Sequence, residues 1–335
     1  DNEGVSAEKL SVQGTSTSYF SVSAQKDVQL ENSVFTQNTA DGPEEASSFT
    51  IASHEGDLYL TNAQINTDYF DGVAMLGAIS GVDSSITARR ALSVRVGAGP
   101  YDSSPDRDLA EGIDFTRAQL STPVIRDLYA DGVVTLKDAS VHMTMPEQTD
   151  FFDAIQNEIT SYTDDVDLSG ASIVYDGEPV ALTISSAKNI KAVDTNLSVT
   201  GRIELRAAEA VDMQATQNDR GHWTASRFDI RATNTLNATG VKLSVAPQTN
   251  IPEERVWNEE TGELEPHYEA LTGAEVKFES TAGQVILTQS TIQATEERTQ
   301  REQPFDIEVK SQTDTLLNQS SITADDLTVT ATAGQ

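Results

Sequence analysis

The chain has 335 residues, of which 37% are hydrophobic and 22% charged, so it holds enough apolar material for a packed core and too much for a disordered chain. Its 53 acidic and 22 basic residues give a net charge of -31, which excludes nucleic acid as a partner because phosphate binding needs a surface rich in Lys and Arg. The chain contains no cysteine, so disulfides, thiolate zinc sites and cysteine nucleophiles are excluded, and no apolar run of about 18 residues predicts a transmembrane helix.

The acidic residues are spread along the whole chain rather than gathered in one tail. Three interpretations fit them: the solvated surface of a halophilic protein, a set of calcium sites, or solubility in a secreted protein. We favour the first, because dispersed acid keeps a protein soluble where salt screens charge repulsion. The chain begins with Asp1 rather than Met, which fits a processed or trimmed product. The expected location is extracellular or at the cell surface, with the periplasm as the alternative.

In chain order, one short phrase recurs: a large apolar residue, a free position, Asn or Asp (sometimes Gln, Arg or Gly), then Ser or Ala, a free position and another apolar residue. Looser copies end at Ile86, Leu197, Val241 and Ile322. Such self-similarity predicts an array of like units. The clear copies are LENSVF (30–35), LTNAQI (60–65), FTRAQL (115–120), LKDASV (136–141), LSGASI (168–173) and LTQSTI (287–292).

Around these phrases apolar and polar residues alternate, which predicts short, half-buried strands. Asp-Gly pairs at 41–42, 71–72, 131–132 and 176–177 predict turns between strands, where a residue must tolerate positive φ. The alternating segments are 20–24, 49–52, 92–96, 197–200, 228–232, 305–309 and 327–330.

Two all-β architectures compete for this pattern. A sandwich or barrel has no reason to repeat its core chemistry, whereas a parallel β-solenoid stacks like strands and keeps each position's residue type. We therefore predict a right-handed parallel β-helix (β-solenoid) as a single domain over residues 1–335, with turns of the coil of roughly 20 residues plus loops. The apolar positions would point inward, the small residue would pack where the coil bends, and the Asn or Asp would bond the turn backbone or its equivalent in the next coil.

Three segments carry a family resemblance: GDLYLTNAQINTD (56–68), GVVTLKDASVHMT (132–144) and GQVILTQSTIQAT (283–295). They resemble the repeats of filamentous-haemagglutinin-type adhesins and related right-handed parallel β-helix surface proteins. The chain departs from those repeats in having fewer glycines, irregular spacing and more acid. The resemblance implies a surface scaffold, and no functional residue carries over from it.

Four inserts interrupt the repeat, at 97–112, 146–167, 247–268 and 295–304. In the second, Thr149 is placed to cap a helix, and the third has the composition of a projecting loop or hairpin around Trp257 with Glu-Thr-Gly-Glu at its tip. The predicted helix would carry on one face Phe151, Phe152, Ile155, Ile159 and Tyr162.

Calcium is the one cofactor that the sequence suggests, through Asp-x-Asp pairs. No catalytic or other cofactor-binding residue is predicted, and zinc is not expected because the four histidines are scattered. The weak calcium candidates are Asp102, Asp106, Asp108, Asp164, Asp165 and Asp167. Three glycosylation candidates are the sequon residues Asn196, Asn237 and Asn318.

The function expected from these features is that of a non-catalytic, rigid, acidic scaffold at the cell surface: an adhesin segment, a stalk or a subunit of a surface assembly. Its partners would be surface or matrix components, or other copies joined through the ends of the fold, since the strand-prone segment 327–335 has no charged side chain. One alternative is a β-helix polysaccharide lyase or glycosidase, although aromatic residues make up only 6%. A second is an envelope protein that bridges lipids through an open apolar groove.

Overall fold

The computed structural model describes residues 4–15, 18–38, 46–97, 111–144, 156–248, 252–258, 263–268 and 274–334. Within these residues it is built of strands, with one five-residue helix, α1 (Glu296–Gln300), so the all-β class is confirmed. Contacts divide the chain into two compact units. Unit 1 comprises Asp1–Phe151, Glu158–Ser172 and Ser185–Lys188, and unit 2 comprises Phe152–Asn157, Ile173–Ile184 and Asn189–Gln335.

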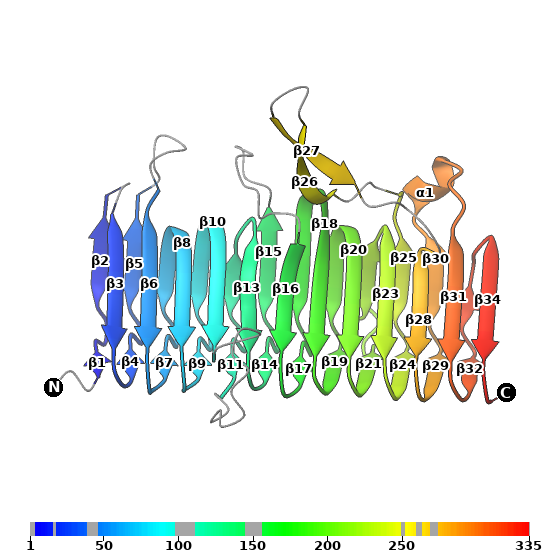
Figure 1. The fold of residues 1–335 in the computed structure, drawn as a ribbon, viewed down its shortest axis with the longest axis horizontal. Coiled ribbons are helices and arrows are strands. Elements are labelled where there is room, and N and C mark those ends of the chain that lie inside the picture. The colour runs from blue at the N-terminus through cyan, green and yellow to red at the C-terminus, as the bar shows by residue number, and fades with distance from the viewer. Residues whose placement is uncertain are drawn as a thin grey trace. The chain divides into compact units, whose positions relative to one another are not determined.

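The strands form a 12-stranded sheet, which we call sheet A, a second parallel set that closes on itself as a barrel, and a two-stranded antiparallel sheet (Figure 1). The antiparallel sheet is a hairpin of β26 (Pro252–Asn258) and β27 (Glu263–Tyr268), within the insert for which a hairpin was expected. Two strands of the barrel set, β16 (Gln156–Ser161) and β18 (Ser172–Ser186), contain residues of both units.

In unit 1, the strands of sheet A are β1 (Val5–Ser6), β4 (Val28–Gln29), β7 (Leu58–Tyr59), β9 (Ile79–Ser80), β11 (Ile113–Asp114), β14 (Val134–Thr135) and β17 (Val166–Asp167). The barrel set of unit 1 contains β2 (Ser11–Gly14), β3 (Tyr19–Ala24), β5 (Val34–Gln37), β6 (Ser48–Ser53), β8 (Gln64–Ala74), β10 (Ser85–Val96), β12 (Gln119–Ser121), β13 (Ile125–Ala130) and β15 (Ser140–Thr144).

In unit 2, the strands of sheet A are β19 (Asn189–Val193), β21 (Ala210–Gln214), β24 (Thr235–Thr239), β29 (Gln284–Thr288) and β32 (Thr315–Asn318). The barrel set of unit 2 contains β20 (Asn196–Ala207), β22 (His222–Ala225), β23 (Arg227–Ala232), β25 (Lys242–Val245), β28 (Val276–Ser280), β30 (Thr291–Ala294), β31 (Asp306–Ser311), β33 (Ser321–Ile322) and β34 (Asp326–Ala331).

The predicted fold class, a right-handed parallel β-helix or β-solenoid, is contradicted by the closure of the second strand set into a barrel. The prediction assumed short strands that end at every bend. Instead, β8 is an 11-residue strand that begins in register with β5, at Gln64 opposite Val34, and continues in register with β6, at Tyr69 opposite Ser48. One long strand is therefore hydrogen-bonded to two different strands along its length. Long strands of this kind connect the two rows of paired strands and allow the set to close as a barrel.

The recurring phrase forms a tight turn before a strand of the barrel set. In the copy at 60–65, the amide of Ala63 donates to the carbonyl of Leu60 at 2.9 Å, and Asn62 between them has a φ of 56°. A β-turn whose third residue has positive φ favours Asn, Asp or Gly, because bulkier residues are strained there. The residues at this position that have positive φ are Asn32, Asn62, Asp83, Arg117, Asp138, Gly170, Asp194, Gln289 and Gln319.

This turn corrects the expectation for the Asp-Gly pairs. Gly72 lies inside β8 and Gly177 inside β18, so neither of these pairs marks a turn between strands. The pair at 131–132 does lie between two strands, β13 and β14, as predicted, and the pair at 41–42 lies outside the described residues. The third position of the phrase also stacks as expected: the Asn62 side-chain amide donates to Asn32 Oδ1 at 3.3 Å. Left-handed backbone is thus concentrated in the phrase, which explains its preference for Asn and Asp.

The helix predicted in the second insert is wrong for the part of it that the structure describes, since residues 156–161 form strand β16. Ile159 of that strand is buried and lies in register with Leu128 of β13. The spacing of apolar residues along a short segment cannot predict this tertiary contact. The helix found instead, α1, lies in the fourth insert, where the Thr295 side chain accepts a hydrogen bond from the Arg298 amide as its N-cap.

The core is formed by apolar side chains that align across the parallel ladder. In sheet A of unit 1, Ile79, Ile113, Val134 and Val166 occupy one register position, and each is at most 1% exposed. Aromatic rings align in the same way: Phe49 is in register with Phe20 and Phe70, and its ring centroid lies 6.4 Å and 6.2 Å from theirs. Parallel pairing of like residues therefore accounts for the repeated apolar positions of the sequence.

Candidate functional site

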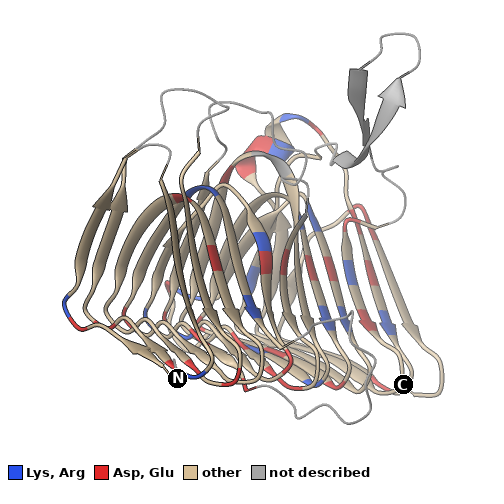
Figure 2. Cartoon of the chain, turned by 60° about the vertical axis from the view of Figure 1, so that its left-hand side comes forward, with Lys and Arg blue, Asp and Glu red and all other residues tan. Residues whose placement is uncertain are grey.

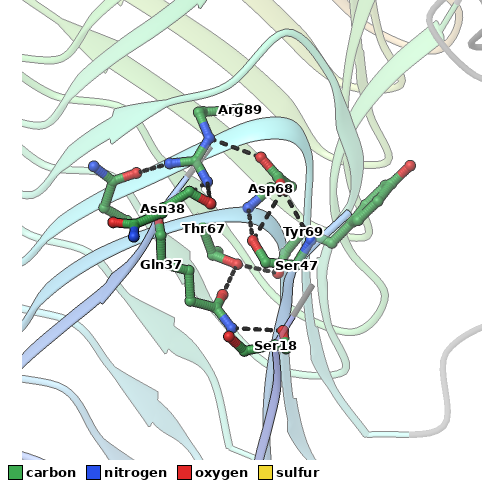
Figure 3. A network of polar contacts seen from close by, with 9 residues as sticks. Ser18, Gln37, Asn38, Ser47, Thr67, Asp68, Tyr69 and Arg89 are labelled. Carbon is green, nitrogen blue, oxygen red and sulfur yellow. Dashed lines mark hydrogen bonds and ion pairs between the residues drawn. The ribbon is translucent and has the colours of Figure 1, made fainter. Parts of the chain in front are cut away.

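A buried polar network lies where β5, β6, β8 and β10 meet (Figure 3). Its centre is Asp68, which is 2% exposed and accepts hydrogen bonds from the Ser47 amide at 2.8 Å and the Ser47 hydroxyl at 2.9 Å. The Arg89 guanidinium pairs with its other oxygen at 2.7 Å. Burial of a carboxylate is tolerable only with such partners.

The same network extends to the amide of Gln37. Its nitrogen donates to the Ser18 carbonyl at 2.8 Å, and its oxygen accepts from the Thr67 hydroxyl. A serine nucleophile needs an adjacent base to take its proton. Since Asp68 is held by a cation and the network contains no histidine, its arrangement fixes strands in place rather than activating Ser47.

Half of the calcium candidates can be located. Asp102, Asp106 and Asp108 lie outside the described residues. Asp164 pairs with Lys188 Nζ at 2.9 Å, and Asp167 accepts from the Ser169 amide at 2.9 Å. Within the part of the chain that the structure describes, no three His, Asp or Glu side chains gather in a group that could hold a metal ion. Calcium binding by the first three aspartates stays a prediction.

The three sequon residues lie in different settings. Asn196 accepts from the His222 amide at 3.0 Å, and the Asn237 amide donates to Asp212 at 2.7 Å, so both side chains take part in links between neighbouring strands. Asn318 is exposed at the end of β32. Glycosylation stays a prediction, and Asn318 is the acceptor with the most open surroundings of the three.

The strands at the C-terminal end of unit 2, β32, β33 and β34, leave core-facing apolar side chains uncovered. Leu327 is in register with Ile307, and Val329 with Val309, yet they are 45% and 43% exposed whereas their neighbours in β31 are buried. Leu317, in register with the buried Leu287, is 41% exposed. Although the barrel set closes on itself through its long strands, β33 pairs with β30 and β34 with β31 on one side, as β32 of sheet A pairs with β29. No strand follows β34 in the described residues.

The strands at the N-terminal end of unit 1, β1, β2 and β3, form the matching edge. Val22 and Phe20 are partly exposed, while their register partners in β6, Ile51 and Phe49, are buried. Val12 of β2 relates in the same way to the buried Phe35 of β5. Both edges follow one order along the chain: a strand of sheet A, a turn with positive φ at Lys9 or Gln319, and two strands of the barrel set.

The two edges are almost free of charge, in a chain whose net charge is -31. Strands β1, β2 and β3 contain no Asp, Glu, Lys or Arg, and the three C-terminal strands contain only Asp326. Natural proteins protect unpaired strand edges with charged side chains, proline or a covering segment. Apart from Asp326, the strands of these edges lack this charge protection. They are therefore the candidate functional surface, which we call the two open edges.

Sequence reasoning found one of the open edges and missed the other. The uncharged segment 327–335 was visible as a strand without protection, but the segments of the N-terminal edge look like ordinary alternating strands. Only their pairing on one side distinguishes them.

In comparisons with known proteins, no family model, curated protein or solved structure matches the chain. The described residues include no helix that is long and apolar enough to cross a membrane.

Proposed function

We propose that the protein is a non-catalytic scaffold whose copies join end to end, the C-terminal open edge of one copy adding to the N-terminal open edge of the next. The observation that carries this proposal is the near absence of charge from the strands of both edges in a strongly acidic chain. Of the roles expected from the sequence, it supports the subunit of an assembly rather than a stalk or a passive adhesin segment. Location at the cell surface is part of the proposal and is tested by protease accessibility on intact cells.

The chemistry of the two edges supports addition of like strands. Backbone groups of β34 and β3 that have no neighbour strand can form a further parallel ladder, and both are six residues long. Leu327 and Val329 would then be covered. Burial of their apolar surface would stabilise the contact by about 25 cal/mol for each Å² removed from water. Because the two contacting surfaces differ, the contact is head to tail and can extend into a chain of copies.

A mixing experiment tests the proposal. Leu327→Lys places a charge at the C-terminal edge, and Val22→Lys places one at the N-terminal edge. Sedimentation should show wild-type oligomers that grow with concentration and persist in about 1 M salt, since apolar and backbone contacts are not screened. In about 1 M salt, where contacts between charged surfaces are screened, each variant alone should stay monomeric. Their mixture should form a dimer that grows no further, because each variant still has one intact edge.

Matched controls are Thr328→Lys and Ser21→Lys, which add the same charge to the same strands on their outward, exposed faces and should retain growth. Circular dichroism confirms that each variant folds. A wild-type chain that stays monomeric at every concentration overturns the proposal, as does a mixture of folded edge variants that forms no dimer.

A further inference from the structure

A second surface, on the outward face of β20, β23, β28 and β31 in unit 2, carries charges in two opposed rows. To these two rows each strand contributes one acid and one base, two residues apart; Arg202, Arg227 and Asp306 lie two residues before the first row on the same face and belong to neither row. In register along the first row lie Glu204, Asp229, Lys277 and Glu308, and along the second row lie Arg206, Arg231, Glu279 and Lys310. The signs of the first row are therefore minus, minus, plus, minus, and those of the second are their inverse at every strand (Figure 2).

Ion pairs within each strand hold these side chains in place. Arg231 pairs with Asp229 at 2.5 Å, Lys277 with Glu279 at 2.8 Å, and Lys310 with Glu308 at 2.7 Å. The hydrogen bond to Glu308 raises the pKa of Lys310 above its ordinary value, so its charge persists over the physiological range. The rows are thus a fixed pattern of charge.

The two rows are electrically balanced, with four acids and four bases, in a chain of net charge -31. Two copies that approach through other acidic surfaces repel each other, whereas the two rows add no net charge at the contact. The second row also extends into solvent: the side chains of Arg206, Arg231 and Lys310 are 57%, 43% and 43% exposed. Their guanidinium and ammonium groups have donors to offer beyond the pairs within the strand.

The inverse order of the rows decides which partner fits. Consider two copies placed face to face and related by a two-fold axis that lies between the two faces and runs perpendicular to the strands. Each strand of one copy then lies over the same strand of the other copy, in the opposite direction. The first row of one copy then lies over the second row of the other, so β23, β28 and β31 each meet opposite charges. In β20 the acid Glu204 is 4% exposed and pairs with Arg206 of its own strand, so Arg206 is the charge that β20 presents. A two-fold axis along the strands would instead place Arg206 over Lys310, a contact of like charge.

We propose that this charged face, formed by the two rows, is a self-complementary docking surface for a second copy of the chain, joined about a two-fold axis across the strands. The contact is lateral and isologous, so it closes as a dimer. It uses different residues from the open edges and does not depend on them. Charge complementarity of this kind confers specificity and orientation more than affinity, so the contact weakens strongly with salt.

A charge swap on one strand tests the orientation. Asp229→Arg combined with Arg231→Asp keeps the composition and the acid-base pair of β23, and it inverts that strand in both rows. Two swapped copies remain complementary, because both partners change together. When a swapped copy faces a wild-type copy, residues 229 and 231 of each copy meet like charges in the other copy. Both proteins also carry Leu327→Lys, so that end-to-end association does not contribute.

Native mass spectrometry of an equal mixture, with one protein labelled with nitrogen-15, measures the sorting. We expect each protein alone to dimerise in about 0.02 M salt, with Kd rising about tenfold or more in about 1 M salt. Mixed dimers should fall about threefold or more below their random share. Labelled and unlabelled wild-type chains, the matched control, should mix at random.

Three outcomes overturn the proposal: monomers of both proteins in low salt, a dimer whose Kd does not change with salt, or mixed dimers at their random share. A folded swapped variant that fails to dimerise with itself also overturns it. Failure of this test leaves end-to-end association untouched, because the edge experiment uses copies whose charged face is intact.

Discussion

Arg298 Nη2 of helix α1 lies 3.3 Å from Glu275 Oε1, and the arginine side chain is completely buried. The same guanidinium donates to the carbonyl of Ala246 at 2.9 Å and to that of Gln303 at 3.1 Å, and it packs against the ring of Phe305. A short helix of five residues has little stability of its own. This ion pair is therefore what attaches α1 to the neighbouring strands.

Replacement of Arg298 by Ala should lower the free energy of unfolding by about 3–5 kcal/mol, because it leaves the Glu275 carboxylate with its cation removed in a buried site. Urea denaturation followed by circular dichroism measures the change. The matched control is Arg301→Ala on the same helix, whose exposed pair with Glu297 contributes roughly 0.5 kcal/mol. Equal losses for the two variants would contradict the assignment.

The buried network around Asp68 predicts a second difference between neighbouring carboxylates. Asp68→Ala leaves the Ser47 amide without its acceptor and removes the carboxylate that pairs with the Arg89 guanidinium, so it should cost about 3 kcal/mol. Asp71→Ala removes an ion pair with Arg95 in which both side chains are about one third exposed, and it should cost less than about 1 kcal/mol. Thermal unfolding of the two variants in one buffer checks which variant loses more stability. A smaller loss of stability for Asp68→Ala than for Asp71→Ala would contradict the prediction.

The left-handed turns predict a double-mutant cycle. Gly170 has a φ of 74°, and a Cβ added to it would lie 1.9 Å from Asp138 Oδ1, so Gly170→Ala should cost about 2 kcal/mol. Asp138→Gly removes that oxygen and the strain of its own φ of 55°. The double variant should recover about half of the loss, measured as midpoints of urea unfolding. Strict additivity of the two changes would argue against the contact.

Tyr59 predicts a late step in alkaline titration. The hydrogen bond from its hydroxyl to Asp57, at 2.7 Å, together with burial raises its pKa to about 12. The folded pKa lies above the ordinary value of 10.0, so the stabilisation from this bond is complete below pH 10 and disappears as pH rises towards about 12. Absorbance at 295 nm should show a high-pH step that Tyr59→Phe removes and Asp57→Asn shifts to lower pH. A step that Asp57→Asn leaves unchanged would contradict this cause.

Local features of the chain could be predicted because they depend on nearest neighbours. Alternation with a period of two indicated the strands, and the Asn or Asp of the phrase indicated a special backbone position, found at Asn62 and Asp138. The helix predicted after Thr149 was wrong over residues 156–161, because apolar spacing alone does not show what an apolar side chain packs against: Ile159 faces the core from a strand. The sequence did not predict closure of the barrel set for a similar reason. The continuity of β8, which pairs first with β5 and then with β6, depends on contacts between distant strands.

By itself, then, the sequence determined the all-β class, the excess of acid and the turn residues of the phrase, because each follows from composition or from a short run of neighbours. The tertiary structure alone decided which strands pair on one side only and which charges share a row. Glu204 and Glu308 are about a hundred residues apart, and only parallel register places them in one line. Both proposed surfaces are products of that register, in which distant segments align their like positions.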